Sequence, residues 1–545
     1  MRSHHLLVRA LLTAAAVASN RPAAAVNPLE YPDNGATAFS RGGAWLATAT
    51  DPIAAHYNPA ALATQSSGFD INLNASFQKV CFDRRNPGNA LTGPQQESND
   101  TPGVLVYLPA CNERRGFPKT VPSLGVALRM SRRWALGFAF VPPSAYTDAA
   151  GAWPEFQAGF NTRTGRKTAV PAPYRYLQTE NHSLIFLPTF SLGVEVFPNF
   201  RVGAGFIWGI GVIDITKFDV TRTAASHVGD HATADDVRAE LKTQDFFMPG
   251  VVLSAHWSIL DHLDIGAWAR WVDSVRTTDA DLEIRANYFG SSGKNPVCGR
   301  AETNCGQKAV VNEFGNDEFE KFQFAVIPPE LRVGIRFHLP RARTKVAAQP
   351  GAERPNRDPL HDDVFDVELD SSYTQSSEAD VAQVRLRGSP SGEAVVPFEP
   401  IGFLPPNADR RNGYRNTFGA RLGGQYNVVR DKLAALAGSW IESQAAPDAY
   451  LHISPVPALR GGVGGGLIVR QSPVDFVVGY QRHWSQQMDN GGRGAARANA
   501  GIATDTTFRV GQAPEDRQFR TGQAVNGGRV SQSAHVFTLG AVWRF

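Results

Sequence analysis

The sequence predicts an all-β protein: a transmembrane antiparallel β-barrel of about fourteen strands. Three observations lead to this fold class. Apolar and polar residues alternate over many stretches of strand length, short turns alternate with long polar loops, and the first residues have the order of an export signal. The 51 glycines and the aromatic content of 10% suit many strands joined by turns.

The last stretch, residues 533–545, has the clearest strand pattern. Apolar residues recur there at every second position: Phe537, Leu539, Ala541, Trp543 and Phe545. All five therefore face one side of an extended strand. In a soluble sheet an apolar edge strand would recruit neighbours, whereas a closed barrel pairs its last strand with its first. A strand that ends on Phe also resembles the C-terminal strand of bacterial outer-membrane barrels, which implies the barrel-assembly machinery as a partner that acts through Phe545.

The first 25 residues are predicted to be a signal peptide. Arg2 and Arg9 flank the start of an apolar stretch over residues 6–17, and small residues follow it, including Ala23–Ala25. The alternative is an uncleaved anchor, but the apolar stretch is short for that. Export to the cell outer membrane is therefore the expected localisation.

Residues 26–67 differ in kind from the rest, because they contain little strand alternation and much Ala and Gly. Asp51-Pro52 and Asn58-Pro59 each place a capping residue before a proline, which predicts two short helical turns. Turns of this size need walls around them. The segment is either a hatch within a barrel or an appendage on a soluble domain.

This segment resembles the N-terminal hatch of the FadL-type long-chain fatty acid transporters. The resemblance rests on Gly42-Gly43-Ala44, Thr50-Asp51-Pro52 and above all residues 57–63, and it continues in patches such as residues 327–334 and 454–457. It implies a fourteen-stranded barrel plugged by its hatch, passive uptake of long-chain fatty acids or other hydrophobic molecules, and release through a lateral opening. The gate residues that it implies are Asp51, Pro52, Asn58, Pro59 and Ala60.

Residues 68–545 are expected to form the barrel. The fourteen candidate strands lie near residues 71–77, 124–130, 134–140, 182–196, 202–210, 251–259, 263–269, 331–339, 365–369, 418–428, 433–441, 461–469, 474–484 and 537–545. A soluble β-sandwich is the alternative, but its turns should be of similar length at both ends. Residues 341–363 are polar and fall where a short turn is expected, which indicates either an insertion or a slip of register.

The four cysteines fall into two local pairs, Cys81 with Cys111 and Cys298 with Cys305. Three connectivities are possible for an exported chain, and local pairing costs the least loop closure. A metal site is the alternative, but neither pair has His partners at a ligand-like spacing.

Catalysis and cofactors are not expected. No Gly-x-Ser-x-Gly elbow or comparable arrangement brings a nucleophile and a base together, and His361 with Asp362 and Asp363 is read as a solvated turn and not as a metal site. The 54 basic and 51 acidic residues nearly balance, so nucleic acid is not an expected partner. The expected partners are the outer-membrane bilayer and a hydrophobic ligand such as a fatty acid, and the chain is expected to be a monomer.

Candidate substrate contacts are the apolar side chains of presumed outer loops, Phe246, Phe247, Phe403 and Leu404. The alternative is that these loops pack on one another and cap the barrel. Lys217 and Arg385 are candidates for binding a carboxylate, against the reading that they are ordinary loop bases. An adhesive or structural barrel and a small-solute porin remain the rival functions.

Overall fold

The computed structural model describes residues 34–85, 105–113, 119–142, 153–161, 165, 167–220, 236–277, 280–286, 308–310, 319–323, 327–341, 357–386, 396–398, 402–404, 410–499 and 520–545. The predicted signal peptide (1–25), Cys298 and Cys305 lie outside these residues. The predictions made for them therefore stay predictions.

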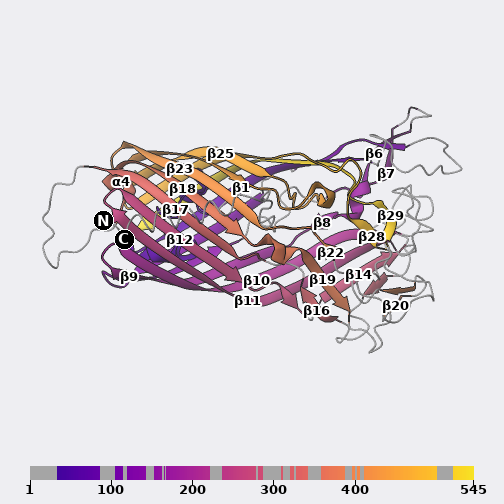
Figure 1. Ribbon diagram of the computed structural model, residues 1–545, viewed down its shortest axis with the longest axis horizontal. Coiled ribbons are helices and arrows are strands. Elements are labelled where there is room, and N and C mark those ends of the chain that lie inside the picture. Colours follow the sequence, from indigo (N-terminus) through magenta and orange to yellow (C-terminus); the bar gives the residue numbers. More distant parts are fainter. Residues whose placement is uncertain are drawn as a thin grey trace, which may run out of the picture.

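Fourteen antiparallel strands form a closed barrel (Figure 1). They are β1 (Gly68–Arg84), β4 (Lys119–Arg129), β5 (Trp134–Val141), β9 (Leu184–Phe197), β10 (Phe200–Val220), β11 (Asp236–Leu260), β12 (Leu263–Val272), β17 (Glu330–Pro340), β18 (Asp363–Thr374), β23 (Thr417–Val429), β24 (Leu433–Glu442), β25 (Arg460–Gln471), β26 (Val474–Ser485) and β30 (Gly528–Arg544). Each strand pairs with the next one in this order. The last strand closes the barrel on the first, in continuous register from Gly68↔Arg544 to Arg84↔Gly528. The predicted barrel and its strand number are confirmed.

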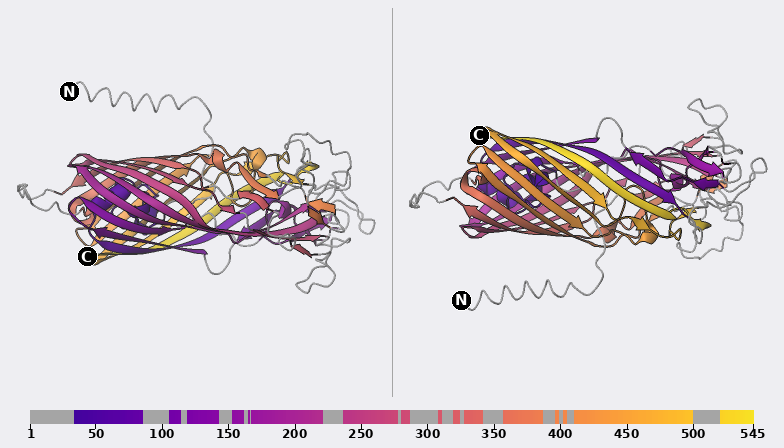
Figure 2. Two further views of the ribbon diagram at one scale, coloured as in Figure 1. Left: turned by 90° about the horizontal axis from the view of Figure 1, so that it is seen from below. Right: turned by 90° about the horizontal axis from the view of Figure 1, so that it is seen from above.

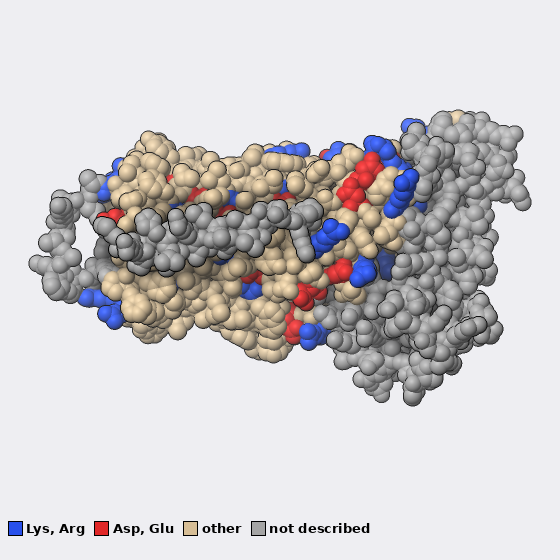
Figure 3. Space-filling view, viewed as in Figure 1, with Lys and Arg blue, Asp and Glu red and all other residues tan. Residues whose placement is uncertain are grey.

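The wall follows the period of two that the sequence shows. In β30 the side chains of Leu539 and Trp543 are exposed on the outer face, whereas Thr538 and Val542 are buried toward the lumen. The wall facing the viewer in Figure 3 is largely free of charged side chains, and Lys, Arg, Asp and Glu gather beyond it on one side. This apolar band is the surface that a bilayer would cover.

The two ends of the barrel differ. One end carries the tight turns, such as Asp261-His262 between β11 and β12, together with the C-terminal Phe545 (Figure 2). We call this end periplasmic, because short turns lie on that side in outer-membrane barrels. At the outer end, strand extensions and small sheets contain β2 (Leu105–Tyr107), β3 (Ala110–Glu113), β6 (Phe156–Asn161), β7 (Lys167–Pro171), β8 (Glu180–Asn181), β13 (Arg276–Thr277), β14 (Ala280–Ala286), β15 (Lys308–Val310), β16 (Phe319–Gln323), β19 (Val381–Leu386), β20 (Val396–Phe398), β21 (Gly402–Leu404), β22 (Arg410–Arg411), β27 (Met488–Asp489), β28 (Arg497–Asn499) and β29 (Arg520–Ala524).

Helical elements are few and short. Three belong to the N-terminal segment: α2 (Ala36–Ser40), α3 (Ala54–Tyr57) and the 3-10 helix η1 (Pro59–Thr64). The others are η3 (Pro173–Tyr176), α4 (Pro359–Asp362), η5 (Ser376–Ala379) and η6 (Asp448–Tyr450). In the described part of the chain, none of the helices has the length and apolar character needed to cross a membrane.

The polar segment over residues 341–363 is an insertion and not a slip of register. β17 and β18 pair from Glu330↔Thr374 to Pro340↔Asp363, with a single shift at the last step. The extra residues therefore form a longer connection at the periplasmic end, and α4 is its last turn.

Candidate functional site

The hatch, residues 34–67, fills the lumen. Nearly all of its residues are buried, although many of them are alanines that offer little apolar surface. Carboxylates of β18 hold its backbone instead: Asp370 accepts from the amides of Trp45 and Leu46 at 3.0 and 3.1 Å, and Glu368 accepts from Thr48 at 3.1 Å. Because these hydrogen bonds satisfy buried amides, the hatch is fixed by polar contacts to one side of the wall.

Small residues in the wall let the hatch approach it closely. A Cβ at Gly203 of β10 would overlap the amide of Ala60, and a Cβ at Gly423 of β23 would overlap the carbonyl of Arg41. Glycine at these positions therefore allows backbone to pack against backbone.

The predicted gate residues lie in the hatch, but their side chains do not cap helices. Asp51 Oδ1 is 3.1 Å from Arg544 Nη2 of β30, and its burial raises the pKa of the carboxyl while Arg544 opposes that shift. Asn58 donates from Nδ2 to the Leu46 carbonyl at 2.7 Å. Pro59 begins η1 and Pro52 precedes α3, as the two predicted turns require. The amide of Ala60 donates to Ser254 Oγ at 2.8 Å.

A belt of arginines faces the lumen at the outer rim of the hatch. We define this arginine belt as Arg270, Arg332, Arg421 and Arg460 with the carboxylates of Glu330 and Glu442, all carried by strands from β12 to β25. Glu330 is contacted by Arg332 at 2.6 Å and by Arg270 at 3.6 Å, and Glu442 by Arg421 at 3.0 Å and by Arg460 at 2.9 Å. Through these direct contacts four guanidinium groups share two carboxylates.

Sequence analysis did not identify the belt as a site. The signal was present in part, since Arg332 and Arg421 recur on the polar faces of two strands with clear alternation. Their convergence depends on the order of strands around the barrel and on the register between them, and neither is visible in one strand alone.

An apolar cluster lies directly beside the belt. This inner cluster comprises Leu46, Ile185, Leu187, Ile207, Ile213, Met248, Val252, Trp268, Val272, Val275 and Ile327. Trp268 joins it to the belt, because the guanidiniums of Arg332 and Arg270 lie 5.1 and 5.6 Å from its ring centre. Its Nε1 also donates to the His56 carbonyl of the hatch at 2.8 Å.

The β9–β10 ladder behind the inner cluster is interrupted, and we call this stretch without ladder pairs the wall gap. The β9–β10 ladder runs to Ile207↔Thr189 and resumes at Ile210↔Phe186, so Trp208 and Gly209 lie outside it. Pro188, opposite them, has no amide hydrogen to contribute to a ladder. On the other side of β10 the register with β11 shifts at the same level, between Gly209 and Gly211.

Phe246 and Phe247 lie beside this gap, and their predicted placement in an outer loop is wrong. Both belong to β11, and the register shift turns both outward, with 59% and 53% of their surface exposed while Met248 is buried. The ring of Phe247 packs edge-on against Trp208 at 5.0 Å. Outward aromatics at one level of a barrel are typical of its interfacial girdle.

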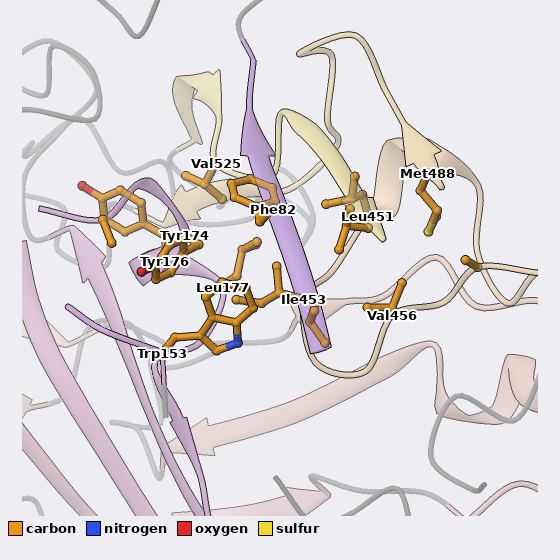
Figure 4. Packing of buried hydrophobic residues seen from close by; sticks show 14 of the residues in the cluster. Phe82, Trp153, Tyr174, Tyr176, Leu177, Leu451, Ile453, Val456, Met488 and Val525 are labelled. Atoms are coloured by element: carbon orange, nitrogen blue, oxygen red, sulfur yellow. The ribbon is translucent and has the colours of Figure 1, made fainter. Parts of the chain in front are cut away.

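The outer part of the lumen contains a second apolar cluster, the outer cluster (Figure 4). It combines Phe82 of β1, Tyr174 and Tyr176 of η3, Trp153 and Ile453, and further residues from the connections at this end. The predicted loop contacts Phe246 and Phe247 are not among its members.

The remaining candidates do not converge on the belt. Lys217 lies near the outer end of β10, opposite Ala239 of β11, whereas Arg270 is opposite Val252, much nearer the periplasmic end. Arg385 belongs to β19, and Phe403 and Leu404 to β21, whose backbones pair with β16 and β20 in small outer sheets. Cys81 of β1 and Cys111 of β3 form a disulfide across paired strands.

Solved structures with the same architecture exist at low sequence identity. The structure superposes on a FadL homologue from Pseudomonas aeruginosa with a TM-score of 0.58, at 16% identity, over 95% of this chain and 99% of that one. The fold is that of the FadL-type barrels. The toluene transporter TodX of Pseudomonas putida shares the FadL-type fold with a TM-score of 0.52, at 11% identity, over 95% of this chain and 99% of that one.

No family model matches the sequence, and no curated protein matches it either. The two solved structures confirm the FadL-type resemblance at the level of the fold.

Proposed function

We propose that this FadL-type chain is an outer-membrane channel for the passive uptake of hydrophobic small molecules. The observation that carries the proposal is that the hatch occupies the lumen and adjoins an apolar cluster, which itself lies behind a gap in the wall. A plugged lumen of this kind does not suit ions or sugars, whereas an apolar path suits a greasy molecule.

Within this class we propose a long-chain fatty acid as the substrate. The arginine belt supports a carboxylate head group, since Arg binds carboxylates through paired, charge-assisted hydrogen bonds. The inner cluster beside Trp268 supports an apolar tail in contact with that head-group site. Other residues at the outer end stay candidates for an earlier contact with the substrate: Lys217, Arg385, Phe403 and Leu404.

The arrangement also supports a route. The substrate would meet the outer cluster first, then the belt and the inner cluster, and would leave sideways between β9 and β10 at the wall gap. Movement of the hatch at Asn58 and Pro59 would open the passage, because η1 packs against β9 and β10 at Gly193 and Gly203, on the periplasmic side of the gap.

Binding of matched ligands tests the substrate class. Oleate and oleyl alcohol have the same tail, so a belt that recognises a carboxylate should bind oleate more tightly. Arg421→Gln should weaken oleate binding about tenfold and leave oleyl alcohol unchanged, as loss of one charge-assisted contact predicts. Arg529→Gln is the matched control, since Arg529 pairs with Asp489 outside the belt. Equal losses for both ligands would contradict a carboxylate site.

Electrical recordings separate the rivals. In planar bilayers a small-solute porin would conduct ions steadily, whereas a hatch-plugged channel should conduct little. An adhesive barrel would bind neither ligand.

We further propose that the chain is a monomer, exported by residues 1–25 and inserted by the barrel-assembly machinery through β30 and Phe545. The outward apolar face of β30 supports this last step.

A further inference from the structure

The last residues of the connection between β17 and β18 contact the hatch from the periplasmic side. We call this segment, residues 357–362, the strap; it contains Arg357, Asp358 and α4. Figure 1 shows α4 at the periplasmic end of the barrel. The strap contacts the hatch and the wall through three different kinds of interaction.

Arg357 is the first point of attachment. Its amide donates to the carbonyl of Thr64 at 3.0 Å, and its Nη1 donates to the carbonyl of Ala47 at 3.4 Å. Its Nη2 forms a short ion pair with Asp264 of β12. One residue therefore joins the middle of the hatch, the end of the hatch and the wall.

Asp358 is the second point of attachment, and it reaches a different part of the wall. Its carboxylate lies 2.5 and 3.1 Å from the guanidinium of Arg470 on β25. Arg470 in turn pairs with Asp475 of β26 at 2.5 Å, and Asp475 contacts Arg544. Since Arg544 also lies 3.1 Å from Asp51, a chain of polar side-chain contacts runs from the strap to the hatch.

Leu360 is the third point of attachment, and it is apolar. It is 3% exposed and packs in one cluster with Ala36 of the hatch and with Leu436, Ile468 and Val477 of the wall. Asp358 fixes the local turn, because its Oδ1 accepts from the Leu360 amide at 3.2 Å. The three attachments thus touch the beginning, the middle and the end of the hatch.

We propose that the strap locks the hatch in its seat from the periplasmic side and closes the direct path from the lumen to the periplasm. Arg357 and Asp358 have opposite charges and lie next to each other in the chain, yet they bind β12 and β25, which are separated by β17, β18, β23 and β24 in the wall. A segment fixed at both of these places spans part of the mouth. The role in transport rests on the proposed function: a blocked axial path leaves the wall gap as the exit.

Hydrogen exchange of the hatch amides tests the lock without any ligand. The variant Arg357→Met with Asp358→Asn removes both charged attachments while keeping side-chain size. Exchange of the amides of residues 45–48, which are bonded to Asp370 and Glu368, should become at least about tenfold faster. Ion conductance in planar bilayers should rise in the same variant, because a released hatch uncovers the lumen.

Arg341→Met is the matched control, because Arg341 lies at the other end of the same connection and donates to the carbonyls of Asp363 and Asn427, both on the wall. Leu360→Ala keeps both charges and serves as the second variant if the double variant does not assemble. Unchanged exchange in either folded strap variant, or an equal acceleration in Arg341→Met, would overturn the lock. Oleate binding by the unmodified protein is measured separately. A failure of the proposed function can therefore be distinguished from a failure of the lock.

Discussion

Arg41 of the hatch lies 2.6 Å from Asp366 of β18, and both side chains are almost completely buried inside the barrel. Asp366 also pairs with Arg336 of β17 at 3.1 Å, and Arg41 approaches Glu368 at 3.5 Å. The hatch is therefore part of a buried ionic network whose other members belong to the wall. Burying such charges is costly unless every member is paired, so the network favours the one position of the hatch that pairs them.

Arg41→Met should loosen the hatch. Removing Arg41 leaves Asp366 with Arg336 as its one remaining partner in the network described above, and breaking a buried ion pair costs about 3–5 kcal/mol. The expected result is faster exchange of hatch amides while the barrel strands keep their protection. Arg529→Met is the control, because its partly exposed pair with Asp489 should contribute about 0–1 kcal/mol. Similar effects of the two variants on the hatch would contradict this prediction.

Gly423→Ala should displace the hatch by steric overlap. The added Cβ would occupy the place of the Arg41 carbonyl, so the hatch would have to move away from β23. We expect ion conductance to increase in planar bilayers. Gly461→Ala provides the comparison, because its Cβ would meet Trp440 and Trp484 of the wall and no part of the hatch. If only Gly461→Ala opened the channel, close packing at Gly423 would not be what seats the hatch.

The barrel could be predicted from the sequence because each strand carries its own evidence. Residues such as Leu539 and Thr538 must face opposite sides of a strand, and lipid and lumen demand different chemistry on those sides. The pattern fails where the backbone departs from period two. Phe246 and Phe247 both face outward because the register shifts beside Gly209, and no local sequence signal distinguishes this from a loop.

The site could be predicted less well, because its contacts join distant parts of the chain. Asp51 and Asn58 were identified as hatch residues, but their partners Arg544 and Leu46 follow only from the fold. A polar lumen also makes buried segments resemble solvated ones. Arg357 therefore appears in the sequence as part of a polar turn, although its side chain reaches the hatch and Asp264.

The seating of the hatch should depend on pH through two groups of opposite effect. Burial raises the pKa of Asp51, so the ionised carboxylate destabilises the seated hatch, and this cost disappears as the pH falls through the raised pKa. Burial lowers the pKa of His56 well below its ordinary value, and Arg270 and Arg332 add to this shift. The seated hatch then loses stability as the pH falls below the ordinary pKa of histidine, because only the displaced hatch takes up the proton.

Two variants separate these contributions. Between pH 7 and pH 5, Asp51→Asn should leave a hatch that loosens on acidification, by up to about tenfold in exchange rate per pH unit. His56→Gln should leave a hatch that no longer loosens over the same range, because the group that takes up the proton is gone. The measurement is exchange of hatch amides after correction for the intrinsic rate at each pH. Identical pH profiles for both variants would show that neither group governs the seat.

A cross-link beside the wall gap should slow the release of substrate into the bilayer. Phe186 and Ile210 are paired at the first position above the gap, so Phe186→Cys with Ile210→Cys can join β9 to β10 there. Once oxidised, this pair should slow transfer of bound oleate from the protein to surrounding vesicles, because the two strands can no longer separate. Binding of oleate should be unchanged, since the belt and the inner cluster are intact.

Leu192→Cys with Ala204→Cys is the matched control, because it joins the same two strands where their ladder is continuous. Reduction should restore transfer in the first pair only, and the unmodified protein treated with the same reductant accounts for any effect of opening the Cys81–Cys111 disulfide. If both cross-links slowed transfer equally, movement of the whole wall would be responsible. If neither did, oleate would leave by a path other than the gap between β9 and β10.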